Sequence, residues 1–421
     1  MQKIRQWGQR QTAQMRGMDT SMKLYISILI FTAIGLAFSN NVVSNYFKDA
    51  YQVDAYQRGL IEFPREIPGI ISIFVIAGLS FLSDLRISMI AQILSAIGIF
   101  ILGVTTPSFN IMLLFIFINS MGMHLFFPLQ DSIGLSLAEK DKMGVRMGQY
   151  KGIFTGFQML ASVFVFIGFK TGFLSFTAPV KWLFLLAGIA AIIVFYLMLK
   201  LDRHMQSSHH QPKLKVVFRK EYSLYYILVV MFGVQKQIMM VYGPWVLIEL
   251  LNKQADTLAI LTIISSFIGI FFIPAIGRWL DRYGVKKLLY ADALSFIGVY
   301  MLYGLLSAGY VSDTLPKVGI GVLLAYGLFI IDRMSTQMSI VRTVYLKTIA
   351  LSASDITPTL TLGQSMDHFV SILCAYLGGI VWMSWGPQYI FFLAAGLSVV
   401  NLVVAIVVKI PADSEVHVAV K

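Results

Sequence analysis

Residues 87–130 read ISMIAQILSAIGIFILGVTTPSFNIMLLFIFINSMGMHLFFPLQ, a run of 44 residues without Asp, Glu, Lys or Arg. About 20 apolar residues suffice for one helix to cross a membrane, so the run is long enough for two spans. The turn signal Thr106-Pro107-Ser108 divides it near its middle. The stretch therefore predicts two membrane helices joined by a tight turn, and it indicates an integral membrane protein.

The composition of the 421-residue chain agrees with this prediction. It is 57% hydrophobic and only 13% charged, with a mean hydropathy of +0.76, whereas soluble domains carry about 25% charged residues. A water-soluble enzyme is thereby excluded, and so is a disordered protein, which needs low hydrophobicity. The single Cys374 permits neither an intrachain disulfide nor a cysteine-based metal site. Since phosphate-cradling loops and metal-ligand clusters are also lacking, we expect no metal, no cofactor and no catalytic residues.

Twelve segments are long and apolar enough to span a membrane. The first is a full span, so we expect no removable signal peptide before it. The segments are 24–47, 59–83, 87–106, 110–137, 145–169, 181–200, 222–250, 257–279, 287–309, 316–346, 357–383 and 387–408.

The distribution of Lys and Arg predicts the orientation. If both termini are cytoplasmic, 23 of the 33 basic residues fall in inside segments and six in outside loops, and four lie within spans. Cytoplasmic segments are enriched in Lys and Arg, so we predict that the N- and C-termini are cytoplasmic. The net charge of +12 then reflects membrane topology, and no nucleic-acid partner is expected.

The chain has a natural midpoint in the polar stretch 201–221, with six predicted spans on either side. A shift of 197 residues superposes Asp84 on Asp281 and spans 1–2 on spans 7–8, which indicates an internal repeat. We therefore predict a six-helix bundle at 1–200, a cytoplasmic linker at 201–221 and a second, pseudo-symmetric six-helix bundle at 222–421.

The segment IGRWLDRYGVKK at 276–287 resembles the G-x-x-x-D-R-x-G-R/K-K signature of the major facilitator superfamily. A degraded copy, LSFLSDLRISM, lies at 79–89. The resemblance covers essentially the whole chain, and it implies an all-α fold of twelve transmembrane helices in two bundles. Residues 342–382, which include Asp367-His368, look like a group of prokaryotic permeases within this superfamily. The Gly-Pro-x-x-Gly-Gly run of drug–proton antiporters is absent from 152–169.

The signature predicts a conformational latch at the cytoplasmic helix ends. A carboxylate there can accept hydrogen bonds from helix N-termini and pair with Arg, and such a contact holds one state and breaks in the other. The alternative is that the basic residues only mark topology, and we favour that interpretation for Lys286 and Lys287. The predicted latch residues are Asp84, Arg86, Gly277, Asp281, Arg282 and Gly284.

Ionisable residues inside a membrane cost about 2.5–3.5 kcal/mol each on insertion scales, so they are candidate functional residues. They concentrate in spans 2, 4, 5, 7, 10 and 11, which border the cavity if the superfamily resemblance holds. Lys236 should pair with Asp332 or Asp367. The alternative is a purely structural ion-pair network, and for His368 a simple hydrogen bond to a neighbouring helix is an equally good interpretation. The predicted proton-coupling residues are Glu66, Asp332, Asp367 and His368.

Cations and polar groups at similar depth are candidates for binding a substrate. Arg333 can hold an anionic group through two parallel hydrogen bonds, while an asparagine in span 1 either binds substrate or joins helices. The predicted substrate-binding residues are Asn41, Arg65, His124, Lys236, Tyr242 and Arg333.

These observations predict a secondary active transporter, not an enzyme, that rocks two bundles about a central site. We expect a proton-coupled importer of a small anionic or zwitterionic organic solute, acting as a monomer in the lipid bilayer of a prokaryotic cytoplasmic membrane. One alternative is an exporter of amphipathic drugs or lipids. Another is a membrane receptor that binds its ligand without transporting it.

Overall fold

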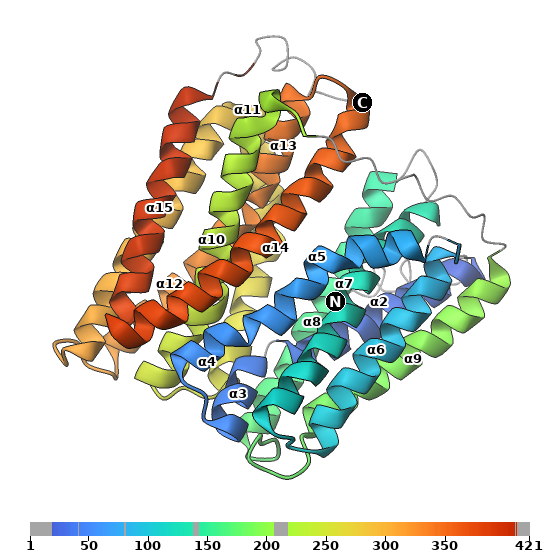
Figure 1. Ribbon diagram of the computed structural model, residues 1–421, viewed down its shortest axis with the longest axis horizontal. Helices are drawn as coiled ribbons and strands as arrows, with labels where there is room; N and C mark the ends of the chain where they lie inside the picture. Colours follow the sequence, from blue (N-terminus) through green and yellow to red (C-terminus); the bar gives the residue numbers. More distant parts are fainter. Residues whose placement is uncertain are drawn as a thin grey trace, which may run out of the picture. The chain divides into compact units, whose positions relative to one another are not determined.

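The computed structural model describes residues 19–40, 42–79, 81–137, 143–205, 218–408 and 410, and the regular secondary structure of these residues is entirely helical (Figure 1). In chain order the elements are α2 (Thr20–Ser39), α3 (Val43–Tyr51), α4 (Ala55–Leu60), α5 (Glu62–Gly78), α6 (Asp84–Val104), α7 (Phe109–Ser136), α8 (Met143–Lys170), α9 (Trp182–His204), the 3₁₀-helix η1 (Lys220–Tyr222), α10 (Ser223–Trp245), the π-helix η2 (Val246–Leu250), α11 (Ala255–Val311), α12 (Ile320–Gln337), α13 (Ser339–Ile349), α14 (Ala353–Ser384) and α15 (Pro387–Val407).

Nine helical segments among the described residues are long and apolar enough to cross a membrane. One of them, the 57-residue α11, has a non-helical residue at Gly284 and covers predicted spans 8 and 9. Predicted span 2 corresponds to α4 and α5, and predicted span 10 to α12 and α13, which meet at Met338. The all-α membrane fold is therefore confirmed, and the helices are consistent with twelve spans.

The contacts within the chain define two compact units. The first comprises Met1–Asn40, Ile71–Ala161 and Pro179–Gln211. In it, α6 packs against α7 and α9, and α2 packs against α9. Tyr25 on α2 donates a hydrogen bond to the carbonyl oxygen of Gln130 on α7 at 2.7 Å. Its ring also meets the ring of Tyr150 edge-on at 4.9 Å. Aromatic and aliphatic packing therefore forms the core of this unit.

The second unit comprises Asn41–Ile70, Ser162–Ala178 and Pro212–Lys421. It includes α3, α4, the beginning of α5 and the helices from α10 to α15. Within it, α10 packs against α14, α11 against α15, and α4 against α14 (Figure 1). A stretch from the first half of the sequence thus belongs to the same compact unit as the second half. The bundle boundaries at residues 200 and 222 stay predictions.

Two local features shape the segment Asn41–Ile70. Asp54 caps α4 by accepting a hydrogen bond from the Gln57 N–H at 2.7 Å, and the Gln57 side chain accepts one from the Asp54 N–H at 3.2 Å. This capping box satisfies backbone donors at the start of a helix. Pro68 lies inside α5 and lacks an N–H, so one backbone carbonyl of α5 has no helical partner. The capping box thus begins the helix that carries Arg58, and Pro68 lies in the helix that carries Glu62 and Glu66.

Lys286 has a structural role beyond the topology marking expected from the sequence. Its Nζ donates hydrogen bonds to the carbonyl oxygens of Ile406 at 3.1 Å and Val408 at 2.9 Å. These carbonyls lie at the end of α15, where a helix leaves acceptors unpaired. A lysine is a favourable partner there because the helix C-terminus carries partial negative charge. The signature segment of α11 is therefore joined to the C-terminal end of α15.

Replacing Gly284 with alanine tests the backbone bend. Gly284 has φ 78° and ψ 163°, a region that is essentially restricted to glycine and costs other residues about 1–3 kcal/mol. We expect Gly284→Ala to lower the melting temperature of the detergent-purified protein. Gly298→Ala, on the same helix with nothing within 4 Å of the added Cβ, is the matched control and should leave stability unchanged or raise it. Equal melting temperatures for the two variants would contradict the assignment.

Candidate functional site

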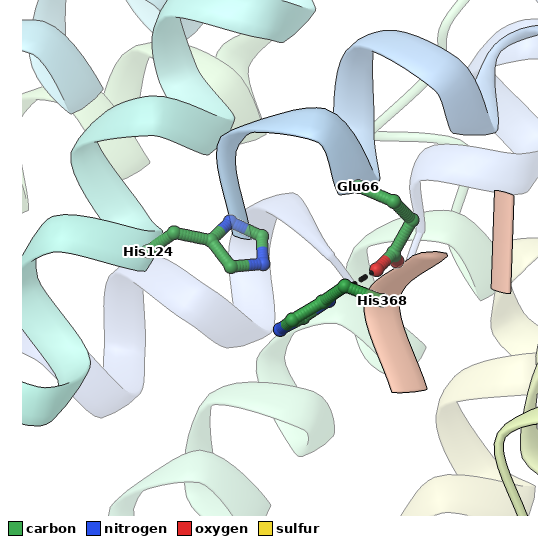
Figure 2. Close-up of side chains that lie close together, drawn as sticks. All are labelled: Glu66, His124 and His368. Carbon is green, nitrogen blue, oxygen red and sulfur yellow. Dashed lines mark hydrogen bonds and ion pairs between the residues drawn. The ribbon is translucent and has the colours of Figure 1, made fainter. Parts of the chain in front are cut away.

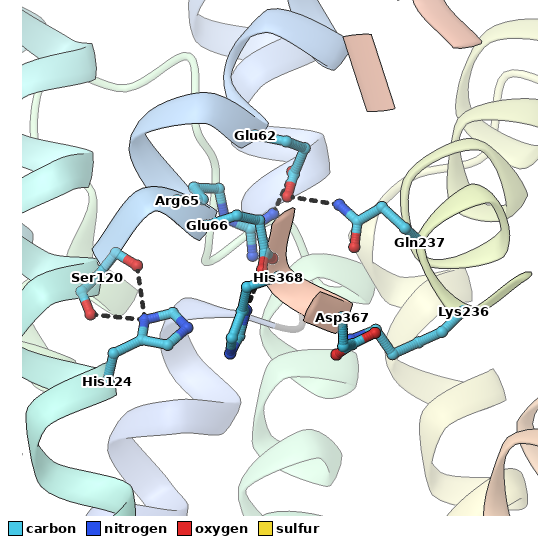
Figure 3. A network of polar contacts seen from close by, with 9 residues as sticks. All are labelled: Glu62, Arg65, Glu66, Ser120, His124, Lys236, Gln237, Asp367 and His368. Carbon is cyan, nitrogen blue, oxygen red and sulfur yellow. Dashed lines mark hydrogen bonds and ion pairs between the residues drawn. The ribbon is translucent and has the colours of Figure 1, made fainter. Parts of the chain in front are cut away.

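The carboxylate of Glu62 is the centre of a buried charge cluster in the second unit. Its Oε1 accepts from Arg58 Nη1 and from Arg65 Nη1, both at 2.5 Å, and its Oε2 accepts from Gln237 Nε2 at 3.1 Å. The Glu62 side chain is fully buried, and that of Arg65 is 17% exposed. One carboxylate therefore holds two guanidinium groups and joins α4 and α5 to α10. Figure 3 shows its contacts with Arg65 and Gln237.

Arg58 was not among the predicted site residues, but the structure buries it almost completely. Its guanidinium carbon lies 5.5 Å from the centre of the Phe47 ring, and its Nη2 is 3.4 Å from the Ser44 hydroxyl. An unpaired buried charge would be very costly, so this arginine depends on Glu62. Counting basic residues between apolar runs gives their topology but not their depth, and Arg58 was missed as a site residue for that reason.

Glu66 lies one turn beyond Glu62 on α5, and it binds the predicted residue His368. The Glu66 Oε2 is 2.8 Å from the His368 Nδ1, and both side chains are largely buried (Figure 2). A Cβ added at Gly69 would come within 2.7 Å of three atoms of the imidazole ring. Glycine at position 69 thus permits the close approach of α5 to α14 that brings the acid and the histidine together.

Lys236 pairs with Asp367 and not with Asp332, which resolves the two alternatives that the sequence left open. The Lys236 Nζ donates to the Asp367 Oδ2, linking α10 to α14 (Figure 3). The side chains are 25% and 15% exposed, so this pair is the more accessible part of the network. The other carboxylate oxygen, Oδ1, is buried without a hydrogen-bond partner. A Cβ on Gly233 would lie 2.7 Å from that oxygen, so glycine is needed there as well.

Three consecutive residues of α10, Gln235, Lys236 and Gln237, contact three different helices. The Gln235 amide donates to the Ser398 hydroxyl at 2.7 Å and accepts from Asn401 at 3.2 Å, both on α15. Successive residues of a helix point about 100° apart, so one turn reaches α15, α14 and α5. The two glutamines were missed from the sequence, although amides flanking a lysine in an apolar span were a usable signal.

Asp332 and Arg333 are neighbours on α12 with different surroundings. Asp332 is buried and accepts a hydrogen bond from the Tyr300 hydroxyl at 3.3 Å. The same hydroxyl lies 2.7 Å from the carbonyl oxygen of Gln235. Arg333 is half-buried, with its guanidinium carbon 5.0 Å from the centre of the Phe329 ring. Asp332 is thus built into the helix packing, while Arg333 offers a partly exposed cation.

A second buried ion pair, between Arg342 and Asp292, was also missed. The Arg342 Nη1 lies 2.5 Å from the Asp292 Oδ2, and its guanidinium carbon lies 3.8 Å from the centre of the Phe232 ring. The pair joins α13 to α11 beside α10. From the sequence, Arg342 counted as a cytoplasmic topology marker. Its burial shows that it is part of the packing of the second unit.

The remaining candidates for substrate binding have different surroundings. Asn41 lies outside the described residues. His124 on α7, in the first unit, has its Nδ1 2.9 Å from the carbonyl oxygen and 3.1 Å from the hydroxyl of Ser120 (Figure 3). Tyr242 is fully buried, donates to the carbonyl oxygen of Ala375 and stacks on Trp382 at 5.8 Å. In this conformation Tyr242 therefore packs α10 against α14.

The two copies of the latch segment also differ. In the first unit, Asp84 accepts from the Ser132 hydroxyl at 2.6 Å, and Arg86 lies 3.6 Å from Asp202. In the second unit, Asp281 and Arg282 are exposed, and Arg282 lies over the Tyr283 ring at 5.3 Å. A Cβ at Gly277 would meet nothing within 4 Å. Only the first copy thus has a defined polar partner for its aspartate among the described residues.

Replacing Glu62 with glutamine tests the charge cluster. The variant leaves Arg58 buried without a carboxylate, and breaking a buried pair in this way costs about 3–5 kcal/mol. We expect a large fall in melting temperature in detergent. Glu249→Gln is the control, because Glu249 is 28% exposed and lies 3.7 Å from Lys48. Such partly exposed pairs contribute less than about 1 kcal/mol. Similar losses in the two variants would contradict a special role for Glu62.

Comparison with known proteins places this arrangement in a family. Residues 24–359 match the model of the Major Facilitator Superfamily, whereas no curated protein gives a significant match to the sequence. Among solved structures, the nucleoside transporter NupG is 17% identical with a TM-score of 0.71, and the match covers 93% of this chain and 99% of NupG.

Two further structures have the same fold. A bacterial homologue of the iron transporter ferroportin, in an inward-facing state, is 12% identical with a TM-score of 0.70, covering 95% of this chain and 100% of the other. A POT family transporter in complex with 5-aminolevulinic acid is 12% identical with a TM-score of 0.75, covering 93% and 96%. Identities this low show a shared fold alone.

The family match extends over most of the chain and includes both halves. Together with the apolar helices, it supports a multi-pass membrane transporter and indicates that the protein is not an enzyme. The chain belongs to the Major Facilitator Superfamily.

Proposed function

We propose that the protein is a secondary active transporter that moves a small anionic or zwitterionic organic solute by alternating access, with protons as the coupling ion. The observation that carries the proposal is the pair of adjacent residues Asp367 and His368 on α14. Each contacts an ionisable partner on a different helix, Lys236 on α10 and Glu66 on α5. A proton that binds either residue changes which helices are held together.

The proton chemistry follows from these contacts. Protonation of Asp367 would remove the charge that binds Lys236 and free its ammonium group for a substrate. Protonation of His368 would strengthen its bond to the Glu66 carboxylate, because a charged pair binds more tightly than a neutral hydrogen bond. Ionisable groups of this kind inside a membrane protein are typical of proton pathways. Asp332, which is buried and accepts a hydrogen bond from Tyr300, is a further proposed proton-coupling residue.

The proposed substrate class rests on the exposed part of the network. Lys236 and Asp367 present an ammonium and a carboxylate side by side, which suits a solute with an acidic group or with both charges. Arg333 supplies a second cation beside an aromatic ring. Arg65, which the sequence analysis also proposed for substrate binding, is held by Glu62 in this conformation.

Movement would break and reform contacts of α5. The rocking bodies that we propose are the bundles at 1–200 and 222–421. In this conformation the Glu62–Gln237 and Glu66–His368 bonds hold the beginning of α5 to α10 and α14. Alternating access requires that these bonds break at one stage of the cycle.

Transport in proteoliposomes tests the coupling role of Asp367. With an imposed pH gradient and a panel of labelled carboxylates, amino acids, 5-aminolevulinic acid and nucleosides, we expect Asp367→Asn to reduce gradient-driven accumulation at least about tenfold, which corresponds to about 1.4 kcal/mol. Substrate counterflow, which needs no proton gradient, should persist. Asp313→Asn is the matched control because Asp313 is 81% exposed.

The outcomes of this experiment separate the functions. Full gradient-driven uptake by Asp367→Asn would exclude its coupling role. Uptake confined to hydrophobic dyes would favour an exporter of amphipathic compounds. Ligand binding without counterflow would favour a receptor.

The latch is tested separately at Asp281. If its carboxylate holds one conformation of the transport cycle, Asp281→Asn should slow counterflow and increase hydrogen–deuterium exchange near residues 276–287, because one state loses a charge-assisted contact. Lys287→Gln changes an exposed charge in the same segment and should alter neither measurement. Unchanged counterflow and exchange in Asp281→Asn would remove the latch from the mechanism.

A further inference from the structure

The charged side chains around His368 balance each other when the histidine is neutral. Three cations and three carboxylates form one continuous cluster on α4, α5, α10 and α14. They are Arg58, Arg65 and Lys236, and Glu62, Glu66 and Asp367.

The positive and negative charges are not only equal in number but also lie next to one another. Arg58 and Arg65 share Glu62, so this group of three carries one excess positive charge. Glu66, next along α5, interacts electrostatically with Arg65 and supplies the compensating negative charge. Lys236 and Asp367 neutralise each other. Two other buried or half-buried sets in the same unit are balanced too, the Arg342–Asp292 pair and the neighbours Asp332 and Arg333.

Histidine is the side-chain type that can gain or lose a proton near neutral pH, and His368 contributes one to this cluster. In the second unit its imidazole contacts Glu66 on α5, and Glu66 in turn interacts electrostatically with Arg65 on the same helix and with Lys236 on α10. When His368 is neutral the cluster has no net charge. When His368 gains a proton, the sum of the charges on these seven described side chains becomes +1. An uncompensated charge in a low-dielectric interior is expensive.

We infer that the substrate is a monoanion carried together with one proton on His368, so that the carrier crosses between its states without net charge both when loaded and when empty. The bound anion supplies the negative charge that the protonated cluster lacks, and Lys236 and Arg333 are the partly exposed cations available to hold it. This inference rests on the proposed function and narrows its substrate class from anions and zwitterions to monoanions.

The membrane potential distinguishes this cycle from others. A cycle that moves one net charge accumulates substrate about tenfold for every 59 mV of potential. A cycle that moves a proton together with a monoanion transfers no net charge and responds only to the gradients of pH and substrate. A proton carried with a neutral or zwitterionic solute would transfer one positive charge.

The test uses the full-length protein in proteoliposomes, with lactate, benzoate and glutamate as monoanions, glycine as a zwitterion and uridine as a neutral solute. Potassium and valinomycin set the potential, and an internal pH dye reports proton movement. We expect a monoanion to accumulate with an alkaline interior, with one proton entering per anion. Changing the potential from zero to about −120 mV should change this accumulation less than twofold, whereas transfer of one net charge would change it about 100-fold.

The His368→Gln variant provides a second measurement. It should abolish the movement of protons with the anion while leaving anion counterflow measurable. Accumulation that follows the potential, or uptake confined to glycine or uridine, would overturn the inference and leave proton-coupled transport intact. Full proton movement in His368→Gln would overturn it as well. If no probe is taken up under either gradient, the proposed function fails together with the inference.

Discussion

The neutralisation of buried charge at Glu62 is the constraint on which the second unit depends. Two guanidinium groups, from Arg58 and Arg65, converge on one carboxylate oxygen, and the other oxygen accepts from Gln237. Each of these groups would be costly to bury alone, but together they fix α4 and α5 against α10. The cluster explains why residues 41–70 belong to the same compact unit as the second half of the chain.

The polar triplet Gln235-Lys236-Gln237 extends this constraint across the unit. Because its three side chains point in different directions, a single turn of α10 is bonded to α15, α14 and α5. The amide contact with α15 is buried, whereas the ion pair with α14 is partly exposed. A buried hydrogen bond to α15 and a partly exposed ion pair to α14 thus come from adjacent residues of α10. In the proposed mechanism, the charge of Asp367 can therefore change without loss of the packing between α10 and α15.

The sequence predicted the membrane helices because apolar length is a local property of the chain. It also identified Glu66, Lys236, Asp367 and His368 as candidates, since ionisable residues in apolar spans are costly wherever they point. Their partners were harder to predict because Glu66 and His368 are separated by 302 positions. Arg58 was not recognised as a site residue because its burial depends on how α4 folds onto α14, which no count of basic residues reveals. The structure thus adds pairing and burial to the residues that the sequence singled out.

A transporter must stabilise each conformation and still be able to leave it. Different contacts of α5 are suited to these two requirements. The Glu62 cluster contains permanently charged arginines, so changes of pH within the physiological range do not remove their charges. The Glu66–His368 contact, one turn away, contains a histidine, the side-chain type that can gain or lose a proton in that range. Glu62 therefore holds α5 against α10, and in the proposed mechanism His368 provides the response to protons. Since Gly69 brings the histidine against α5, a change in its charge acts directly on the contact between α5 and α14.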